Sequence, residues 1–294
     1  MKLATIQHDI FWEQPEENFA HLADLISAAA DTGARLVMLT EMFSYGFSMN
    51  VSQIAEAADG PSTQFLVEQA RSHNIWLGGT IPVRAASNSG RGDSGPSNTG
   101  RGDSVRADTA SLKATPKAKN MFVLAAPDGS THSYAKIHPF TYGGEDDHYE
   151  GGDDLVQVQV EDIRVSLSVC YDLRFPYIFW PLAETTDLYL VPANWPSKRR
   201  HHWQSLLVAR AIENQAYVAG INRVGTGGDI HYSGDSAIIS PTGETLAAGT
   251  TTAGTTAPDL ASPETILTAD IDPQVVASVR SRFPFLQDRL QNIS

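Results

Sequence analysis

The sequence contains a single cysteine among 294 residues. One thiol cannot form an intramolecular disulfide, and it excludes zinc ribbons and iron–sulfur clusters built on several cysteines. Basic residues are also scarce, because 21 lysines and arginines stand against 34 aspartates and glutamates and leave a net charge of −13. Such an excess of negative charge repels phosphate backbones, so we expect no nucleic-acid partner.

Long hydrophobic runs are missing as well. No window approaches the roughly 18 uncharged apolar residues of a membrane span, and the first residues do not have the pattern of a signal peptide. Without an export signal or a disulfide, the cytoplasm is the expected compartment. The composition, 41% hydrophobic and 19% charged, is typical of a globular protein that can bury a sizeable core.

Short aliphatic runs alternate with helical patterns along the chain. The runs lack polar alternation, which is typical of strands buried on both faces, and the alternation with helices indicates an α/β fold. Helices are predicted at 15–30, where apolar residues fall at i, i+3, i+4 and i+7, and at 63–73, 177–184, 198–214 and 273–280. Strands are predicted at 3–8, 34–39, 75–81, 121–126, 163–169, 188–191, 216–221, 237–240 and 265–271.

Two segments interrupt this pattern. Residues 84–118 are rich in Gly, Ser, Asn, Thr and Asp, and they contain an imperfect ten-residue repeat with two Arg-Gly-Asp triplets. Residues 249–262 form a second, shorter low-complexity stretch. Such compositions bury too little surface to order themselves, so we predict two flexible insertions. The triplets raise the alternative of adhesion to a cell-surface receptor, but for a chain expected in the cytoplasm a duplicated loop is favoured.

Two side chains at predicted strand ends have the setting of catalytic groups. Cys170 ends an apolar run and precedes a polar turn, and ligands of open α/β sheets bind beyond the carboxyl ends of strands. Glu41 directly follows another apolar run, where a buried carboxylate is costly unless it is paired. Each has a structural alternative, because free cysteines are often simply buried and strand-end acids are often exposed.

Two further strand ends turn from apolar to polar residues. Lys136 lies among apolar and aromatic residues, and Glu145 follows nine positions later in a Gly-Gly-Glu turn. The run that begins at Leu188 ends in Asn194 and Trp195. A lysine at a strand end is usually solvated, so Lys136 by itself does not identify a site.

Several segments together resemble the signatures of the nitrilase superfamily of carbon–nitrogen hydrolases. The three main ones are 40–43 (Thr-Glu-Met-Phe), 134–138 (Tyr-Ala-Lys-Ile-His) and 168–176 (Ser-Val-Cys-Tyr-Asp-Leu-Arg-Phe-Pro), and they occur in the family's order. Segments 192–196 and 210–215 resemble later characteristic segments of the family. Segment 41–49 is most similar to the bacterial omega-amidase branch, which deamidates acids of the 2-oxoglutaramate type.

This resemblance implies a four-layer α-β-β-α sandwich, formed as one domain over residues 1–294. It also implies a homodimer, in which helices extend the sandwich across a two-fold axis. The expected activity is hydrolysis of a small linear amide to a carboxylate and ammonia. The resemblance implies no cofactor and no metal, because protein groups supply every role.

The catalytic roles follow from the same resemblance. Cys170 is the expected nucleophile and forms a thioester. Glu41 takes its proton, donates it to the leaving ammonia and later activates water. Lys136 and the backbone N–H of Tyr171 stabilise the oxyanion. Glu145 resembles the family's second glutamate, which positions the lysine and the substrate.

Several assignments stay open at this level. Glu150 rivals Glu145, because the intervening loop varies in the family. Arg174 is expected to hold a substrate carboxylate, although it and Asp172 can equally pair elsewhere and fix the turn. His138 is expected to be structural, and no histidine pair has the spacing of a metal site. The predicted substrate-binding residues are Phe43, Tyr171, Arg174, Asn194 and Trp195, whose aromatic members either line the pocket or cover the sheet.

Three alternatives to an amidase remain. Nitrile hydrolysis and N-carbamoyl amine hydrolysis use the same residue types. A non-catalytic binding protein on the same fold is the third, and the joint presence of Glu41, Lys136 and Cys170 argues against it.

Overall fold

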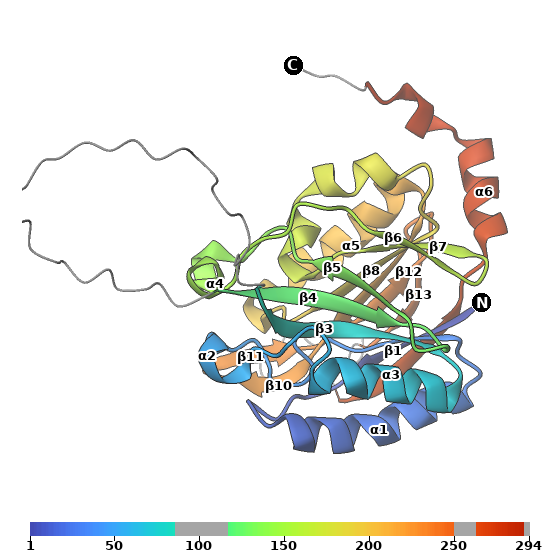
Figure 1. Cartoon of the computed structure of the whole chain (residues 1–294). Coiled ribbons are helices and arrows are strands. Elements are labelled where there is room, and N and C mark those ends of the chain that lie inside the picture. Colours follow the sequence, from blue (N-terminus) through green and yellow to red (C-terminus); the bar gives the residue numbers. More distant parts are fainter. Residues whose placement is uncertain (86–116, 250–262, 291–294) are drawn as a thin grey trace, which may run out of the picture.

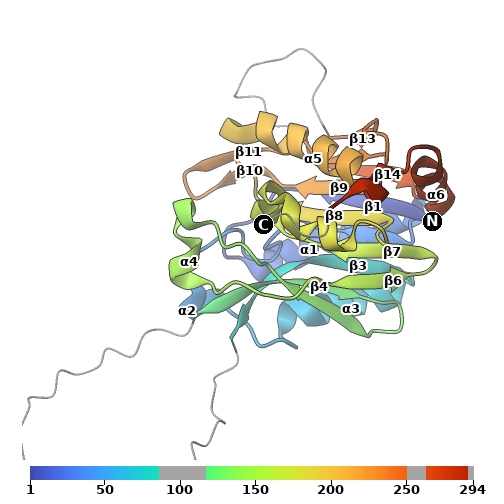
Figure 2. The same cartoon turned by 90° about the horizontal axis from the view of Figure 1, so that it is seen from above.

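Two six-stranded sheets pack face to face, and helices cover their outer faces (Figure 1 and Figure 2). The computed structural model describes residues 1–85, 117–249 and 263–290. The first sheet has the order β14 (Thr265–Asp270), β1 (Lys2–Gln7), β2 (Leu36–Met38), β3 (Trp76–Arg84), β4 (Ala118–Ala125) and β5 (Thr131–Ala135). The second has the order β13 (Thr245–Ala248), β12 (Ala237–Ile239), β9 (Tyr217–Asn222), β8 (Leu188–Ala193), β7 (Ile163–Leu167) and β6 (Gln157–Val160).

The helices form the outer layers and part of the rim. The long helices α1 (Pro15–Asp31) and α3 (Pro61–His73) cover the first sheet, and α5 (Arg200–Asn214) covers the second. Both α1 and α3 begin with proline, whose fixed φ suits the first turn of a helix. The remaining helical segments are α2 (Val51–Ile54), α4 (Glu145–His148) and α6 (Pro273–Arg282), with 3-10 turns η1 (Thr141–Gly143), η2 (Cys170–Arg174), η3 (Pro176–Ile178), η4 (Trp180–Leu182), η5 (Ser197–Arg199) and η6 (Phe285–Asp288).

Each sheet is built around three parallel strands. In the first sheet β1, β2 and β3 are parallel, with Leu36 opposite Trp76. In the second, β7, β8 and β9 are parallel, with Leu188 opposite Tyr217. Antiparallel strands flank both triplets, and a separate hairpin joins β10 (Val224–Gly227) to β11 (Ile230–Ser233). Because parallel strands end at the same edge of a sheet, the residues that follow β2 and β8 lie at the edges where a site can form.

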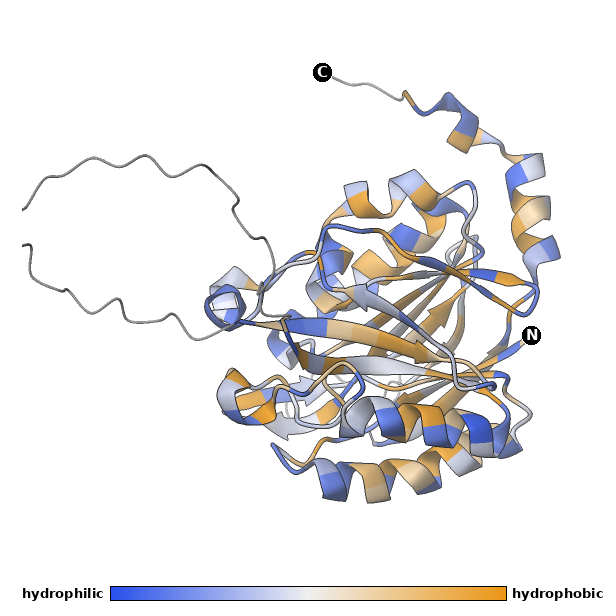
Figure 3. Cartoon of the chain, in the orientation of Figure 1, coloured by the Kyte–Doolittle hydropathy of each residue, from blue (hydrophilic) through white to orange (hydrophobic). Residues whose placement is uncertain are grey.

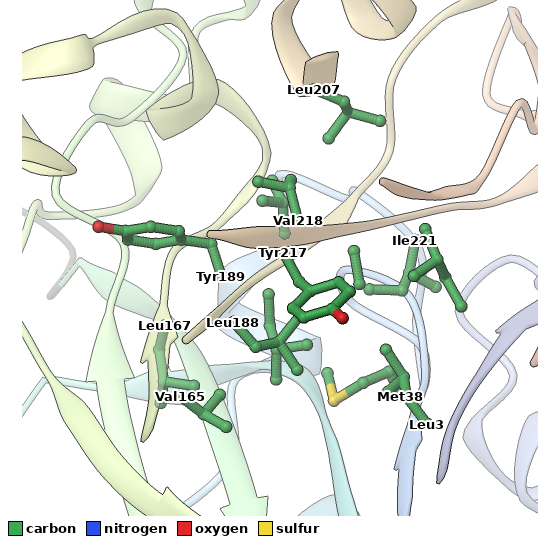
Figure 4. Close-up of a cluster of buried hydrophobic side chains, with 14 of the residues drawn as sticks. Leu3, Met38, Val165, Leu167, Leu188, Tyr189, Leu207, Tyr217, Val218 and Ile221 are labelled. Carbon is green, nitrogen blue, oxygen red and sulfur yellow. The ribbon is translucent and has the colours of Figure 1, made fainter. Parts of the chain in front are cut away.

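The hydrophobic core has two layers, because successive side chains of a strand point to opposite faces of the sheet. On β2, Leu36 and Met38 pack between the two sheets, whereas Val37 packs against the helices over the first sheet. Figure 4 shows Met38 in the inter-sheet layer with Leu188 and Tyr217 of the second sheet. Figure 3 shows several of the interior strands in the hydrophobic colour, while the outer helices alternate between polar and apolar residues. Burial on both faces explains why these strands read as unbroken apolar runs.

The predicted helices and strands are present with shifted ends, with one exception. The helix predicted at 177–184 is wrong, because this segment forms the 3-10 turns η3 and η4. Pro181 lies in the middle of the segment and has no backbone N–H to continue an α-helix. The strands that the sequence analysis did not predict are β6, β10, β11 and β13, and for β5 it indicated only the end at Lys136.

The predicted insertions lie mainly outside the described residues, which exclude 86–116 and 250–262. The ends of the first one need correction, because Arg84 and Ala118 are paired strand residues of β3 and β4. Across the described ranges, no helix is both long and apolar enough to cross a membrane.

Candidate active site

Three charged side chains are buried together at the carboxyl edge of the first sheet. Glu41 lies just beyond β2, Lys136 directly follows β5, and Glu145 begins α4. The Lys136 Nζ lies 3.0 Å from Oε1 of Glu41 and 2.8 Å from Oε2 of Glu145. Lys136 is 2% exposed and both glutamates are fully buried. Buried charges are costly unless they are paired, and here one ammonium serves two carboxylates.

The protonation of this cluster follows from its charges. Burial alone would lower the pKa of Lys136, but Glu145 and Glu41 outweigh burial and raise it well above its ordinary value. Burial also raises the pKa of Glu145, while the nearby Lys136 ammonium counteracts this shift. Lys136 is therefore an ammonium at any working pH.

Two asparagines fix the position of Glu41. The Asn120 side-chain amide donates to Oε1 of Glu41 at 2.7 Å and to Oε1 of Glu145 at 3.2 Å. The backbone N–H of Asn194 donates to Oε2 of Glu41 at 2.7 Å, and its side chain donates to the Glu41 carbonyl at 2.7 Å. Sequence reasoning missed Asn120, although a polar residue just before the apolar run of β4 was a usable signal. Asn194, predicted to bind substrate, also holds Glu41 in place.

The second glutamate of the cluster is Glu145. Its Oε2 also accepts a hydrogen bond from the backbone N–H of Phe140 at 2.6 Å, which closes the turn that precedes α4. Glu150, the rival candidate, is partly exposed and lies 3.6 Å from Lys119. The geometry therefore favours Glu145 as the partner of Lys136.

Cys170 lies on a strained turn that leaves the second sheet after β7. Its φ is +46°, a left-handed conformation that costs a residue with a side chain of order 1 kcal/mol or more. Burial, then the charge of Glu41 and a hydrogen bond with it, raise the pKa of the thiol well above its ordinary value, while Lys136 opposes the shift. The resting group is therefore a thiol that has a carboxylate beside it to accept its proton.

The Asp172 carboxylate holds this turn against the lysine strand. It accepts hydrogen bonds from the Val169 backbone N–H at 3.0 Å and from the Tyr134 hydroxyl at 2.7 Å. It also accepts from the His138 backbone N–H at 3.0 Å and lies 2.8 Å from the His138 ring Nδ1. The structure shows Asp172 in the role considered for it, pairing with other parts of the chain and fixing the turn. His138 contributes to the same network, as expected of a structural residue.

A small cavity of about 50 Å³ opens onto the thiol. Four of the predicted substrate-binding residues line it: Tyr171, Arg174, Asn194 and Trp195. Phe43 lies outside the cavity, because its ring packs against Phe65 with centroids 6.2 Å apart. A Cβ on Gly79 would lie 2.7 Å from the Phe43 ring, so the strand approaches this ring closely. Cavity residues that sequence reasoning did not predict are Phe47, Phe140, Pro196, Arg199, Ile230 and Tyr232.

Two arginines of the cavity wall have no acidic partner in the part of the chain that the structure describes. Among the described residues, no carboxylate lies within 4.0 Å of Arg174 or Arg199. The Arg174 guanidinium stacks 4.6 Å from the Trp195 ring, and that of Arg199 lies 5.3 Å from the Phe140 ring. Burial and the charge of Arg199 lower the pKa of Arg174. Two guanidinium groups that repel each other at one cavity are suited to bind an anion.

The described ranges contain no group of three or more histidine, cysteine or acidic side chains arranged to hold a metal ion.

Comparison with known proteins gives a consistent result. Residues 2–281 match the family described as carbon–nitrogen hydrolase. "Omega-amidase YafV" of Escherichia coli K12 is 32% identical over 289 residues, which cover 98% of this chain and 96% of the relative. "2-Oxoglutaramate amidase" of Bacillus subtilis 168 is 29% identical, with 97% and 96% covered. A crystal structure from Xanthomonas campestris, a CN-hydrolase superfamily protein with an arsenic adduct in its active site, superposes with a TM-score of 0.82. Its sequence is 29% identical, and 100% of this chain and 98% of that chain are covered.

Proposed function

The chain belongs to the carbon–nitrogen hydrolase family and is an amidase, and we propose that it cleaves small linear amides that carry a carboxylate, such as 2-oxoglutaramate. One observation carries the proposal. A buried thiol, a carboxylate whose charge acts on it and an ammonium that pairs with this carboxylate meet beside a cavity whose two arginines have no acidic partner among the described residues. A nucleophile, a proton carrier and an oxyanion partner are the groups that amide hydrolysis requires.

In the first half-reaction, the Cys170 sulfur attacks the amide carbon while Glu41 takes the thiol proton. The carbonyl electron pair moves to oxygen, where the Lys136 ammonium and the backbone N–H of Tyr171 stabilise the negative charge. Glu41 then gives its proton to the amide nitrogen. The carbon–nitrogen bond breaks, ammonia leaves and a thioester remains on Cys170.

In the second half-reaction, Glu41 takes a proton from water as the water oxygen attacks the thioester carbon. The same two donors stabilise the second oxyanion. The carbon–sulfur bond breaks, the acid is released, and Glu41 returns its proton to the sulfur. Glu145 stays paired with Lys136 throughout and keeps the ammonium aimed at the carbonyl oxygen. A positioned acid–base group of this kind contributes roughly 10²–10⁴-fold to the rate.

The substrate class follows from the charges of the cavity wall. The charge of Lys136 is already matched by two carboxylates, whereas Arg174 and Arg199 have no acidic partner among the described residues. A carboxylate at the far end of the substrate supplies the missing partner through charge-assisted hydrogen bonds. The small cavity favours a short linear acyl chain.

Release of ammonia from a panel of amides, nitriles and ureido acids tests this function. We expect the wild-type protein to release ammonia fastest from amides that carry a carboxylate. Cys170→Ala should lower kcat by more than about 10⁴-fold, because no other group replaces the thiol. An unchanged melting temperature is the control for folding. Full amidase activity in Cys170→Ala, or preference for a nitrile or a ureido acid, would contradict the proposal.

We also propose that the enzyme is a cytoplasmic homodimer. Aromatic and aliphatic side chains that support a partner surface are exposed around η3, η4 and η6, namely Tyr177, Trp180, Phe283 and Leu290. A single cysteine suits a reducing compartment. Light scattering on the purified protein should give twice the mass of one chain, and the mass of one chain would contradict the dimer.

A further inference from the structure

The β10–β11 hairpin contributes a wall of the cavity that the mechanism leaves without a role. Ile230 and Tyr232 of β11 line the cavity together with Cys170. Tyr232 is only 1% exposed. The Tyr232 hydroxyl makes no hydrogen bond to any other described residue, yet it is not among the fully buried side-chain atoms that lack a partner. Because Tyr232 lines the cavity, its hydroxyl is accessible there, where a substrate group can accept its hydrogen bond.

The hairpin is fixed by one buried arginine. The Arg223 guanidinium lies 4.8 Å from the centroid of the Tyr232 ring. It donates to the Val224 carbonyl at 3.1 Å and to Asp9 Oδ1 at 2.6 Å, which joins the hairpin to the end of β1. A Cβ on Gly227 would lie 2.5 Å from Arg223 Nη1, so the hairpin closes tightly on the guanidinium. Tyr232 is therefore held on a rigid support, as a specificity residue must be.

The surroundings of Tyr232 indicate which substrate group it meets. Strand β11 packs against η5, which carries Arg199, and the charge of Arg199 acts on the Tyr232 hydroxyl. Burial raises the pKa of Tyr232 to about 12, so the phenol stays neutral and keeps its proton for donation. Arg174 is also close enough to Arg199 for the two charges to interact. Three side chains with hydrogen-bond donors thus line the same cavity, and a carboxylate can accept hydrogen bonds from all three.

We propose that Tyr232 is a specificity-determining residue that donates a hydrogen bond to the substrate carboxylate and completes a clamp with Arg174 and Arg199. Arg223 is the positioning residue that holds Tyr232 in this clamp. The inference rests on the proposed function, because it names the residue that selects carboxylate-bearing amides.

Tyr232→Phe tests the clamp, since it removes the hydroxyl and keeps the ring that stacks on Arg223. The probes are glutaramate and pentanamide, two amides of equal chain length that differ by one carboxylate. For glutaramate, kcat/KM should fall roughly 10- to 100-fold, mainly through KM, because a hydrogen bond to a charged group is lost. For pentanamide, kcat/KM should change less than about twofold. Tyr189→Phe is the matched control, because the buried Tyr189 hydroxyl donates to the Phe179 carbonyl away from the cavity.

The outcomes separate the clamp from the proposed function. A wild-type enzyme that cleaves both amides equally well would overturn the proposed substrate class and the clamp with it. A wild-type preference for glutaramate that persists in Tyr232→Phe would overturn the clamp alone, as would equal losses on both amides, which indicate a structural role. Binding of glutaramate to Cys170→Ala, measured by calorimetry with and without Tyr232→Phe, gives the same comparison without turnover. We expect roughly 10-fold weaker binding in the double variant.

Discussion

The two sheets of the sandwich have matching topology, with three parallel strands and flanking antiparallel ones, yet they supply different parts of the site. The first sheet carries the acid–base groups Glu41 and Lys136 just beyond β2 and β5. The second carries the nucleophile Cys170 beyond β7 and the supporting Asn194 beyond β8. Neither sheet carries all the catalytic groups by itself, so the site exists only where the carboxyl edges of the two sheets meet.

The two halves are also held in different ways. On the first sheet, buried charges hold one another, because Lys136 pairs with two carboxylates at 3.0 and 2.8 Å. On the second, a strained backbone presents Cys170, and the Asp172 carboxylate ties the turn to the lysine strand. The half of the site on the first sheet therefore depends on charge balance, whereas the half on the second sheet depends on hydrogen-bond geometry. Four substitutions test this comparison.

The largest effect on stability is expected from removing the positive charge of Lys136 at the first sheet. Lys136→Met leaves two buried carboxylates without their cation, so we expect a stability loss of about 3–5 kcal/mol as well as loss of activity. The matched control is Lys119→Met, which removes a lysine of β4 that lies 3.6 Å from Glu150 in a partly exposed pair. The control should lose less than about 1 kcal/mol. Urea unfolding near pH 7.5 measures both, and similar losses would contradict the charge-balance account.

A second test concerns the first sheet and measures how the stability of the protein depends on the protonation of His8. This ring is buried and lies 2.9 Å from the Thr40 hydroxyl, next to Glu41, and burial lowers its pKa from 6.5 to about 4. The unfolded chain therefore binds the proton more tightly than the folded protein does. Stability should fall as the pH drops from 6.5 towards 4, by about 3 kcal/mol from His8 alone.

Replacing His8 removes this contribution. In His8→Gln, the stability difference between pH 7 and pH 4, measured by urea unfolding, should be smaller than in the wild type by about that amount. His132→Gln, which replaces an exposed histidine on β5, should keep the wild-type pH dependence. An unchanged pH dependence in His8→Gln would show that the ring does not stay neutral in the folded protein.

The smallest effect is expected on the second sheet. Asp172→Asn keeps the size of the side chain but places an amide N–H₂ against groups that are themselves donors. We expect a stability loss of roughly 1–3 kcal/mol and a lower kcat, because the turn that presents Cys170 loosens. Tyr134→Phe removes a single donor to Asp172 and should cost about 1 kcal/mol. If both variants retain wild-type stability and kcat, hydrogen-bond geometry does not hold the second half.

Much of the fold and the centre of the site could be predicted from the sequence. The parallel strands are buried on both faces, so β1, β2, β3, β8 and β9 read as apolar runs whose ends are visible as the first polar residues. Edge strands such as β6 and β13 were missed, because partial exposure breaks their apolar pattern. A helix was predicted at 177–184, but a central proline prevents an α-helix there.

Side-chain direction was less predictable. Phe43 was expected in the pocket as an aromatic neighbour of Glu41, but the chain turns at these residues, where Met42 has a φ of +51°, and the Phe43 ring lies in the helix-side core. Asn120 was missed because its role depends on the antiparallel pairing of β4 with β3, which brings it beside Glu41. Tyr232 and Arg199 come from segments without a recognisable signature, and their placement depends on how β11 packs against η5.

The sequence by itself determined the alternation of strands and helices, the single thiol, and the strand ends at which Glu41, Lys136 and Cys170 lie. These are local properties, because hydrophobic periodicity and chain position are written in neighbouring residues. Only the tertiary structure decided that Glu145 rather than Glu150 pairs with the lysine, that Asp172 binds the lysine strand, and that two arginines lack acidic partners among the described residues. Such pairings join residues from different strands and turns, and the packing of one sheet on the other fixes which of them meet.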